Sequence, residues 1–471
     1  MTELRRDNII STEKNEAMKK ALAEVRSIMN GRSPKAHIMT FGCQQNTADS
    51  ERLAGLASAM GYTVTDSPDG ADLVLVNTCA VREHAEKKAL SIIGQLKHKK
   101  AENPEMIIGI GGCMVSQQHR ADALKRSYPY VDFSFCTTEL YRVPELVLSR
   151  LSGRKRYFPA DVHEALANTD FSEDVPVLRA SSSRAWVSIM YGCNNFCSYC
   201  IVPYVRGRER SRLPEAIIKE VTELVNDGCL DITLLGQNVN SYGHDLDCGI
   251  NFAQLLKALS EIPGDFRLRF MTSHPKDATT ELIDVIAANP KIARHFHLPM
   301  QSGSDEILRR MNRRYNTEKY AETVRYMREK IPNIVLTSDI IVGFPGETEE
   351  DFEKTLEMLR KIRFDMIYAF IYSPRSGTPA ARSEEQIPEE TKKARFARLV
   401  ELQNEISEEK NALELGKTLR VLSDDGENVT TGRTDGNKLV RFSSPADGGK
   451  FCLVKITDTD TFGLSGTQIN L

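Results

Sequence analysis

Hydrophobic residues in the first third of the chain alternate between two patterns. Short apolar runs have the length of buried strands, and each is followed by a longer stretch in which apolar residues recur at helical spacing. The predicted strands are 37–41, 73–76, 106–110 and 131–135, and the predicted helices are 49–60, 83–99 and 118–126. This alternation predicts a doubly wound α/β domain at residues 33–151. We expect residues 1–32 to form an extension with one amphipathic helix that docks on this domain.

A second alternating run follows a linker at 152–183 and extends over residues 184–408. Six strand and helix units predict a partial (βα)6 barrel. Its predicted strands are 186–190, 232–235, 267–271, 295–298, 335–341 and 366–371.

The last segment, residues 409–471, changes to short alternating strands between Asp-Gly turns. Five such strands predict a small antiparallel β-barrel, at 418–422, 429–432, 438–442, 451–457 and 462–466. Barrels of this size often bind oligonucleotides. However, residues 411–471 hold 7 Lys and Arg against 8 Asp and Glu, so a cap for the central barrel stays an alternative.

Composition narrows the class of protein. A chain of 471 residues needs two or three domains, and its net charge of -3 means that a nucleic-acid partner must be bound through local patches. Ten cysteines without the framework of a small secreted protein indicate a reducing compartment. The longest apolar stretch, 106–115, is about half a membrane span. We therefore expect a cytoplasmic monomer without a membrane partner.

Three cysteines, Cys193, Cys197 and Cys200, have the spacing C-x3-C-x2-C. A four-iron cluster held by three thiolates keeps one iron open, and an open iron can bind a substrate. A structural zinc ion requires four ligands, and the next cysteine, Cys229, follows a predicted helix. The spacing alone leaves zinc or a purely structural cluster as alternatives.

Three further cysteines, Cys43, Cys79 and Cys113, each come directly after one of the first three predicted strands. The carboxyl ends of parallel strands meet at one edge of a sheet, so we expect these side chains to converge on a second site for a soft metal. Glycines beside them, among them Gly111, would let the backbone approach a bulky cluster. The alternative is that they are small buried residues, which is our interpretation of Cys136 after the fourth strand.

Polar residues follow the strands of the predicted barrel, where such enzymes build their active sites. Their side chains could hydrogen-bond the ribose and adenine of a nucleoside cofactor, although each alone is more often a helix cap or a satisfied core group. The candidates are Gln237, Asn238, Ser273, Gln301 and Asp339, with Tyr199 from the cysteine loop.

Arginines are concentrated after the cysteine loop and again near residue 313. Arginine forks onto phosphate oxygens, so these residues are candidates for contact with an RNA backbone; a solvated face is the alternative. The candidates are Arg206, Arg208, Arg210, Arg313 and, in the small barrel, Arg433.

These residues together resemble the methylthiotransferases of the radical S-adenosylmethionine (SAM) superfamily, and among them the branch that acts on N6-isopentenyladenosine in tRNA. The likeness extends from about residue 35 to the end of the chain. Matching stretches are 77–83, 189–193, 207–212, 235–242, 297–304, 311–313 and 339–348. Gln45 and Cys136 depart from the family pattern, where Met and Gly are usual.

The resemblance implies a methylthiotransferase domain, a radical SAM core and an RNA-binding TRAM barrel. It implies two [4Fe-4S] clusters, one on Cys193, Cys197 and Cys200 that binds SAM, and an auxiliary one on Cys43, Cys79 and Cys113. The implied reaction uses a SAM-derived 5'-deoxyadenosyl radical at adenine C2, next to the anticodon, followed by sulfur insertion and methylation from SAM. It further implies an electron donor such as flavodoxin or ferredoxin.

Three alternatives remain at this point. Similar methylthiotransferases act on an aspartate of a ribosomal protein or on threonylcarbamoyladenosine in tRNA. A more distant alternative is a non-enzymatic iron-sulfur protein that binds RNA, against which the open three-cysteine motif argues.

Overall fold

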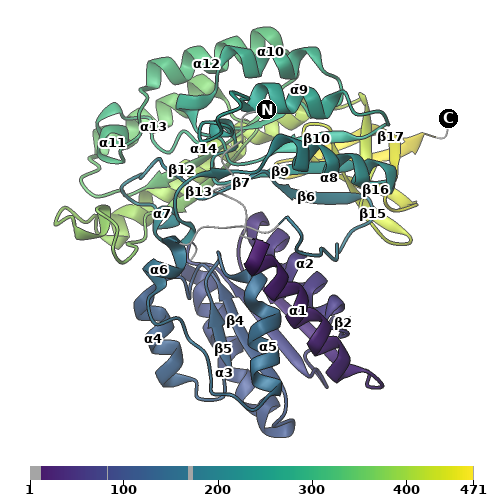
Figure 1. Cartoon of the computed structure of the whole chain (residues 1–471). Helices are drawn as coiled ribbons and strands as arrows, with labels where there is room; N and C mark the ends of the chain where they lie inside the picture. The colour runs from purple at the N-terminus through teal and green to yellow at the C-terminus, as the bar shows by residue number, and fades with distance from the viewer. Residues whose placement is uncertain (1–11, 82, 168–172, 470–471) are drawn as a thin grey trace.

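The first domain is built on a parallel sheet at the base of Figure 1. The computed structural model describes residues 12–81, 83–167 and 173–469. Its first sheet has the order β2-β1-β3-β4-β5, which is typical of doubly wound domains. The strands are β1 (Lys35–Thr40), β2 (Thr63–Thr65), β3 (Leu73–Thr78), β4 (Ile107–Gly112) and β5 (Phe133–Phe135).

Helices cover both faces of this sheet, because successive residues of its central strand point to opposite sides. Leu73 and Leu75 join one buried cluster, whereas Val74 and Val76 join another. The first cluster packs against α1 (Thr12–Met29), α2 (Gln44–Ala59) and α5 (Val143–Leu151), and the second against α3 (Glu83–Glu102) and α4 (Gln118–Ser127). The predicted doubly wound fold is confirmed, and so is the docking of an amphipathic helix near the N-terminus.

The central part contains two parallel three-stranded sheets, with the orders β10-β9-β6 and β11-β12-β13. A parallel bridge between Leu268 and Ile292 joins them, so the six strands stand side by side in chain order. This arrangement confirms the predicted partial barrel. The strands are β6 (Arg184–Ser188), β9 (Asp231–Leu235), β10 (Arg267–Phe270), β11 (His295–His297), β12 (Val335–Val342) and β13 (Met366–Ile371).

Helices follow these strands along the chain, and most of them pack against the largest hydrophobic core. They form an arc over the sheets in Figure 1. They are α8 (Pro214–Asn226), α9 (Phe252–Ser260), α10 (Thr280–Ala288), α11 (Asp305–Arg310), α12 (Thr317–Lys330), α13 (Glu349–Ile362) and α14 (Glu389–Ala412). None of the helices in the described segments is long and apolar enough to cross a membrane.

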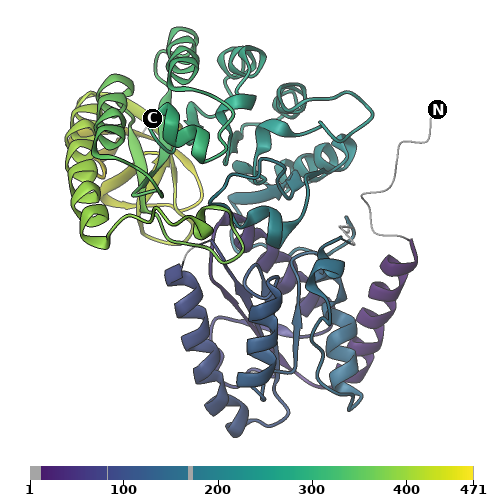
Figure 2. The same cartoon turned by 90° about the vertical axis from the view of Figure 1, so that its left-hand side faces the viewer.

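The last five strands close into a barrel of the order β14-β15-β16-β18-β17, which lies beside α14 in Figure 2. The sequence predicted a purely antiparallel barrel, but β16 and β18 pair in parallel to close it. The strands are β14 (Thr418–Ser423), β15 (Val429–Thr434), β16 (Leu439–Ala446), β17 (Phe451–Asp460) and β18 (Gly463–Ile469).

Candidate functional site

The three strand-end cysteines converge at the carboxyl edge of the first sheet. Cys43 is the N-cap of α2, and a Cβ placed at Gly42 would lie 3.1 Å from the Cβ of Cys79. The Cys113 amide, at the end of β4, donates to the carbonyl of Thr78 over 2.8 Å. The order of the strands therefore brings three cysteines that are far apart in sequence to one edge of the sheet.

A reciprocal pair of asparagines fixes this edge. Asn46 Nδ2 donates to Asn77 Oδ1 over 3.0 Å, and Asn77 Nδ2 donates to the Asn46 carbonyl over 2.8 Å. Sequence reasoning missed Asn46, although it lies three residues after Cys43. The expectation for Gly111 was wrong: a Cβ there would lie 2.2 Å from the ring of Phe135, so the missing side chain makes room for a core aromatic.

The cysteine loop lies between β7 (Met190–Tyr191) and the short helix α7 (Val202–Arg206). Its backbone is held from outside: Asn312 Nδ2 donates to the carbonyls of Phe196 over 2.9 Å and Asn195 over 3.3 Å. Asn312 and Phe196 both adopt positive φ angles, 57° and 47°. Sequence reasoning quoted Asn312 within a motif but gave it no role.

The thiols of both sets lie in water-poor surroundings. Burial raises the pKa of Cys113 to about 12, and the neighbouring Cys79 and Cys43 raise it further, while Arg206 opposes the shift. Burial likewise raises the pKa of Cys193 to about 12 and that of Cys200 still more, with Cys197 adding to the shift of Cys200. Such thiols must lose protons before they bind a metal.

Chemistry of the donors fits iron-sulfur clusters. Each set presents three cysteines, and soft thiolates are the ligands that such clusters use. It is the type of donor that fits and not their present spacing, since in the part of the chain that the structure describes no three His, Cys, Asp or Glu side chains form a group that could hold a metal ion.

Four of the residues predicted to bind a nucleoside cofactor have buried polar atoms without a partner in the protein. These atoms belong to side chains just past β9, β10 and β11: Gln237 Oε1, Asn238 Oδ1, Ser273 Oγ and Gln301 Oε1. A buried polar atom without a hydrogen bond costs about 1–3 kcal/mol, so its position is favourable when a ligand supplies the partner. Gln301 also has a strained positive φ of 70°. The arrangement fits a polar ligand such as SAM.

The other two predicted cofactor residues are in different surroundings. Asp339 Oδ1 lies 3.6 Å from His297 Nε2. The ring of Tyr199 packs edge-to-face on Phe344, with centroids 6.5 Å apart, within a small apolar cluster. Unlike the four residues above, Asp339 and Tyr199 therefore already have contacts within the protein.

The predicted RNA-contact arginines separate into buried and exposed groups. Arg206, Arg210 and Arg313 are only 5%, 5% and 8% exposed, and they donate to groups of the protein. Arg208 and Arg433 are exposed, and the Arg208 guanidinium lies 4.3 Å from the centre of the Phe196 ring. Buried guanidinium groups are not presented to an RNA backbone, so the structure leaves two of the five available for that role.

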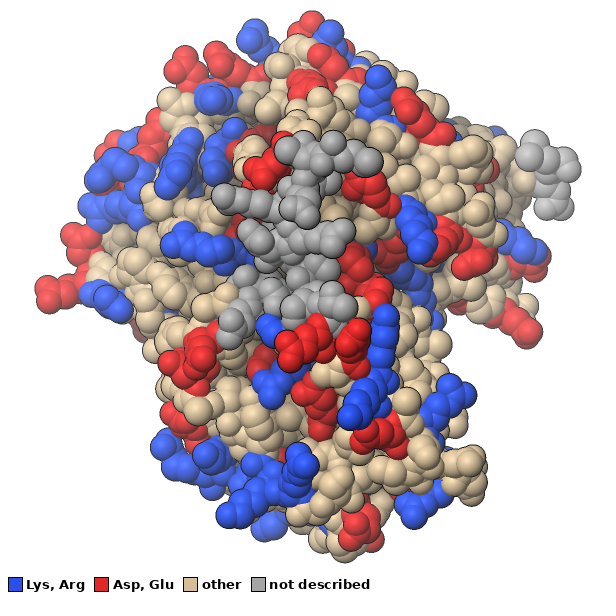
Figure 3. All heavy atoms as spheres, in the orientation of Figure 1, with Lys and Arg blue, Asp and Glu red and all other residues tan. Residues whose placement is uncertain are grey.

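Lys and Arg also gather over α11 on the face shown in Figure 3. The exposed Arg309 and Arg310 belong to this helix, and both form ion pairs with Glu306. The sequence indicated this concentration of arginines, but not that Glu306 and Glu385 partly neutralise it.

The two cysteine sets face each other across a shared interface. Ile201 and Val205, which follow Cys200, the last ligand candidate of the loop, pack with Ala80 and Cys113 in one buried cluster. Past β13, Arg375 donates to the Val81 carbonyl over 2.9 Å. The carboxyl edge of the first sheet is therefore turned toward the mouth of the central barrel.

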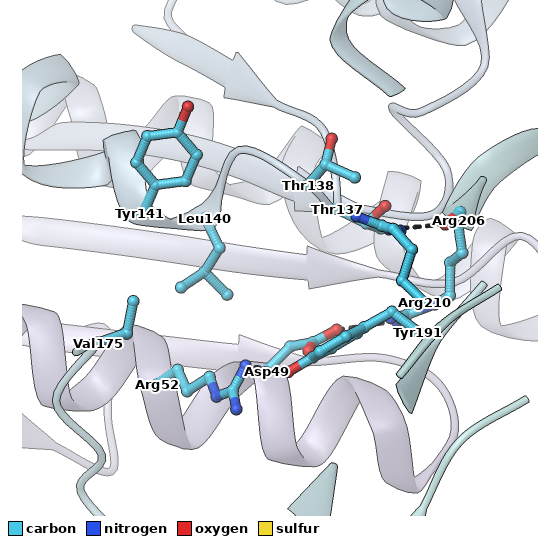
Figure 4. Close-up of a pocket in the computed structure, with 10 residues that line it drawn as sticks. All are labelled: Asp49, Arg52, Thr137, Thr138, Leu140, Tyr141, Val175, Tyr191, Arg206 and Arg210. Carbon is cyan, nitrogen blue, oxygen red and sulfur yellow. Dashed lines mark hydrogen bonds and ion pairs between the residues drawn. The ribbon is translucent and has the colours of Figure 1, made fainter. Parts of the chain in front are cut away.

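A cavity of about 40 Å³ lies at this interface, and Figure 4 shows its lining. Arg52, Arg206 and Arg210 contribute positive charge, with Asp49 and Tyr191 beside them. The cavity separates the first domain from the segment after the cysteine loop.

Comparisons with known proteins agree with this geometry. Residues 187–359 match the model of the Radical SAM superfamily, and residues 35–136 match that of the Uncharacterized protein family UPF0004. A protein of Thermoanaerobacter pseudethanolicus named tRNA-2-methylthio-N(6)-dimethylallyladenosine synthase is 48% identical over 98% of this chain and 99% of its own length. The chain belongs to this synthase family.

Other members of the synthase family are similarly close. The proteins of Acetivibrio thermocellus and of Clostridium botulinum (strain Langeland) carry the same name and are each 47% identical, over 94% and 92% of this chain and 93% and 96% of their own lengths. Membership makes the chain a radical SAM enzyme, which implies SAM and a [4Fe-4S] cluster.

Among solved structures, the fold is similar to that of the radical SAM methyltransferase TsrM from Kitasatospora setae. With its cobalamin and [4Fe-4S] cluster bound, that protein matches with a TM-score of 0.55 at 16% identity, over 74% of each chain. This likeness concerns the fold alone.

Proposed function

We propose that this chain converts N6-isopentenyladenosine next to the tRNA anticodon to its 2-methylthio derivative. Relatives that carry the name of this activity and align over nearly the whole chain support the proposal. The observation that supports it is the buried contact of Ile201 and Val205, which follow the cysteine loop, with Ala80 and Cys113 of the first domain. A reaction that needs both a radical and a sulfur donor requires two centres close together.

The cysteines divide between two clusters in this proposal. Cys193, Cys197 and Cys200 hold the cluster that binds SAM, while Cys43, Cys79 and Cys113 hold an auxiliary cluster. When bound, SAM would supply the radical and the methyl group, and the clusters the electron and a site for the sulfur, which ordinary acid-base side chains cannot provide. The protein positions both centres and excludes water from the space between them.

Hydrogen-bonding roles follow from the buried polar atoms without partners. Gln237, Asn238, Ser273 and Gln301 bind the nucleoside part of SAM in this proposal. Asp339 and Tyr199 lie at the margin of the same site and shape it.

Contacts to tRNA are assigned to exposed arginines. Arg208 and Arg433 contact phosphates of the anticodon arm, whereas Arg206, Arg210 and Arg313 support the site from within the protein. We further propose that the enzyme acts as a monomer in the cytoplasm and takes electrons from a donor such as flavodoxin or ferredoxin. The proposed domains are 33–151, 184–408 and 409–471.

Nucleoside analysis tests the substrate. A strain that lacks the gene should lose 2-methylthio-N6-isopentenyladenosine from its tRNA and accumulate N6-isopentenyladenosine, as measured by mass spectrometry. Unchanged 2-methylthio-N6-isopentenyladenosine would overturn the proposal. Loss of the methylthio group from threonylcarbamoyladenosine or from a ribosomal-protein aspartate instead would identify the related activity.

Iron content tests the ligand assignment. Replacing Cys43, Cys79 and Cys113 with Ala, or Cys193, Cys197 and Cys200 with Ala, should each remove about half of the iron of protein prepared without oxygen, because each set holds one of two clusters. Iron and sulfide are measured per chain. A triple variant with the full iron content would contradict the assignment of that set.

A further inference from the structure

Each cysteine set has one buried arginine whose guanidinium lies against a ligand sulfur. Arg206 Nε lies 3.3 Å from Cys113 Sγ, and Arg313 Nη1 lies 3.3 Å from Cys197 Sγ. Both distances are within the range for an N–H group that donates to sulfur. The same chemical contact therefore occurs at two sites on unrelated elements of the fold.

Both guanidinium groups are fixed by further contacts. Arg206 Nη2 donates to Asp49 Oδ2 over 2.8 Å, and Arg313 Nη2 donates to the Pro299 carbonyl over 3.1 Å. The Arg313 guanidinium also lies 5.3 Å from the centre of the Tyr315 ring. Since arginine presents several donors in a rigid fork, these anchors aim the remaining N–H at the sulfur.

Arg206 makes this contact across the interface. It is the last residue of α7, the helix that follows Cys200, yet the sulfur that it touches belongs to the first domain. Arg52 and Arg210 line the cavity beside it, together with Asp49, the carboxylate that Arg206 contacts. Placing an arginine here costs desolvation energy, which contact with an anionic sulfur would offset.

We propose that Arg206 and Arg313 are positioning residues that raise the reduction potentials of the auxiliary and the SAM-binding cluster, respectively. This inference rests on the proposed function, since it requires a cluster on each cysteine set. Reduction adds one electron to a cluster, and a donor to a ligand sulfur stabilises the more negative, reduced form. Loss of that donor makes reduction less favourable, so the potential falls.

Redox titration of the full chain with both clusters tests the proposal. Dithionite reduces the anaerobic protein, and electron paramagnetic resonance follows each cluster. Arg206→Gln should shift only the auxiliary cluster to a lower potential, and Arg313→Gln only the SAM-binding cluster, so each variant is the control for the other. Arg206→Lys and Arg313→Lys keep the charge and a single donor, and they should recover part of each shift.

Iron content separates this inference from the proposed function. A triple cysteine variant with full iron would overturn the cluster assignment itself. If iron is normal and both potentials are unchanged in the Gln variants, the cluster assignment stands and the role of the arginines is refuted. If a Gln variant does not fold, the Lys variant decides, because an unchanged potential in a folded Lys variant with a weakened sulfur contact contradicts the proposal.

Discussion

His295 lies inside the central barrel and is shielded from water by the fold. The imidazole of His295 lies against the Thr337 hydroxyl, with Nε2 and Oγ1 3.0 Å apart. Burial lowers the pKa of His295 to about 3, and the nearby Arg269 and His297 lower it further. The neutral form is therefore the one that the folded protein accommodates.

This lowered pKa makes stability depend on pH. Below about pH 6.5 His295 binds a proton in the unfolded chain but not in the folded chain. The free energy of unfolding therefore falls as pH decreases. One such residue contributes about 1.4 kcal/mol per pH unit. We expect His295→Gln to lose about 1.4 kcal/mol less than the natural protein between pH 7.5 and 5.5, as measured by urea unfolding. Equal losses in both proteins would contradict this account.

Among single residues, the sequence predicted the placement of the first-domain cysteines better than the placement of the arginines. The cysteines of the first domain could be predicted because each follows a strand, and strand ends share an edge. The burial of Arg206 against Asp49 could not be predicted, since these two residues are 157 positions apart in the sequence. Only the packing of α7 against the first domain brings these two side chains together.

At the scale of elements, the cysteine loop depends on the turn after α11. The Asn312 side chain satisfies two carbonyls of that loop, and its own φ of 57° lies in the left-handed region that Asn and Gly tolerate best. The Ser198 amide also donates to the Met311 carbonyl over 3.0 Å. A loop without regular secondary structure is thus held by a neighbouring turn.

Two substitutions of Asn312 separate the contribution of its side-chain amide from that of its left-handed backbone conformation. Asn312→Gly removes the side-chain amide but leaves the left-handed backbone conformation accessible. Asn312→Ala removes the amide and also disfavours that conformation, so it should lower the free energy of unfolding by roughly 1–2 kcal/mol more than the Gly variant does. We expect iron at Cys193, Cys197 and Cys200 to be lost to a chelator fastest in the Ala variant, then in the Gly variant, then in the natural protein. Equal rates in all three would show that Asn312 does not support the loop.

Predicted elements agree with the structure where their hydrophobic period is long and regular. Strand β13 has the predicted bounds, Met366–Ile371, and helix α4, Gln118–Ser127, extends one residue beyond the predicted 118–126. The three-residue strand β2 was missed because a run so short shows no period. The parallel pairing of β16 with β18 was missed because it depends on how the barrel closes, and adjacent residues do not encode that closure.

At the scale of the whole molecule, buried ion pairs join the central part to the last barrel. Asp231 accepts from Arg269 Nε over 2.9 Å and from Arg267 Nη1 over 3.3 Å. The same two arginines donate to the Thr434 carbonyl, over 2.7 Å and 3.1 Å. Asp231 is thus shared by two guanidinium groups that reach the barrel, and Arg267 has a second carboxylate partner in Asp435.

Removing the buried carboxylate of Asp231 should destabilise the folded protein far more than removing an exposed carboxylate. Asp231→Ala leaves the buried Arg269 without its carboxylate partner, while Arg267 keeps its ion pair with Asp435, and the change is expected to lower the free energy of unfolding by about 3–5 kcal/mol. The matched control is Asp265→Ala, since Asp265 forms an exposed pair with Arg420 of the same barrel. That change should cost less than about 1 kcal/mol. Similar losses in denaturant unfolding would contradict the importance of burial.

The outermost strands of the central sheets, β6 and β13, form no ladder with each other in the described chain. A ring of strands would admit only what could be threaded through its ends. A partial barrel is open along its side, so a long polymer can place one nucleotide in the interior while the segments before and after that nucleotide stay outside. The incomplete circumference is in this sense as suited to a macromolecular substrate as the cysteines are to iron.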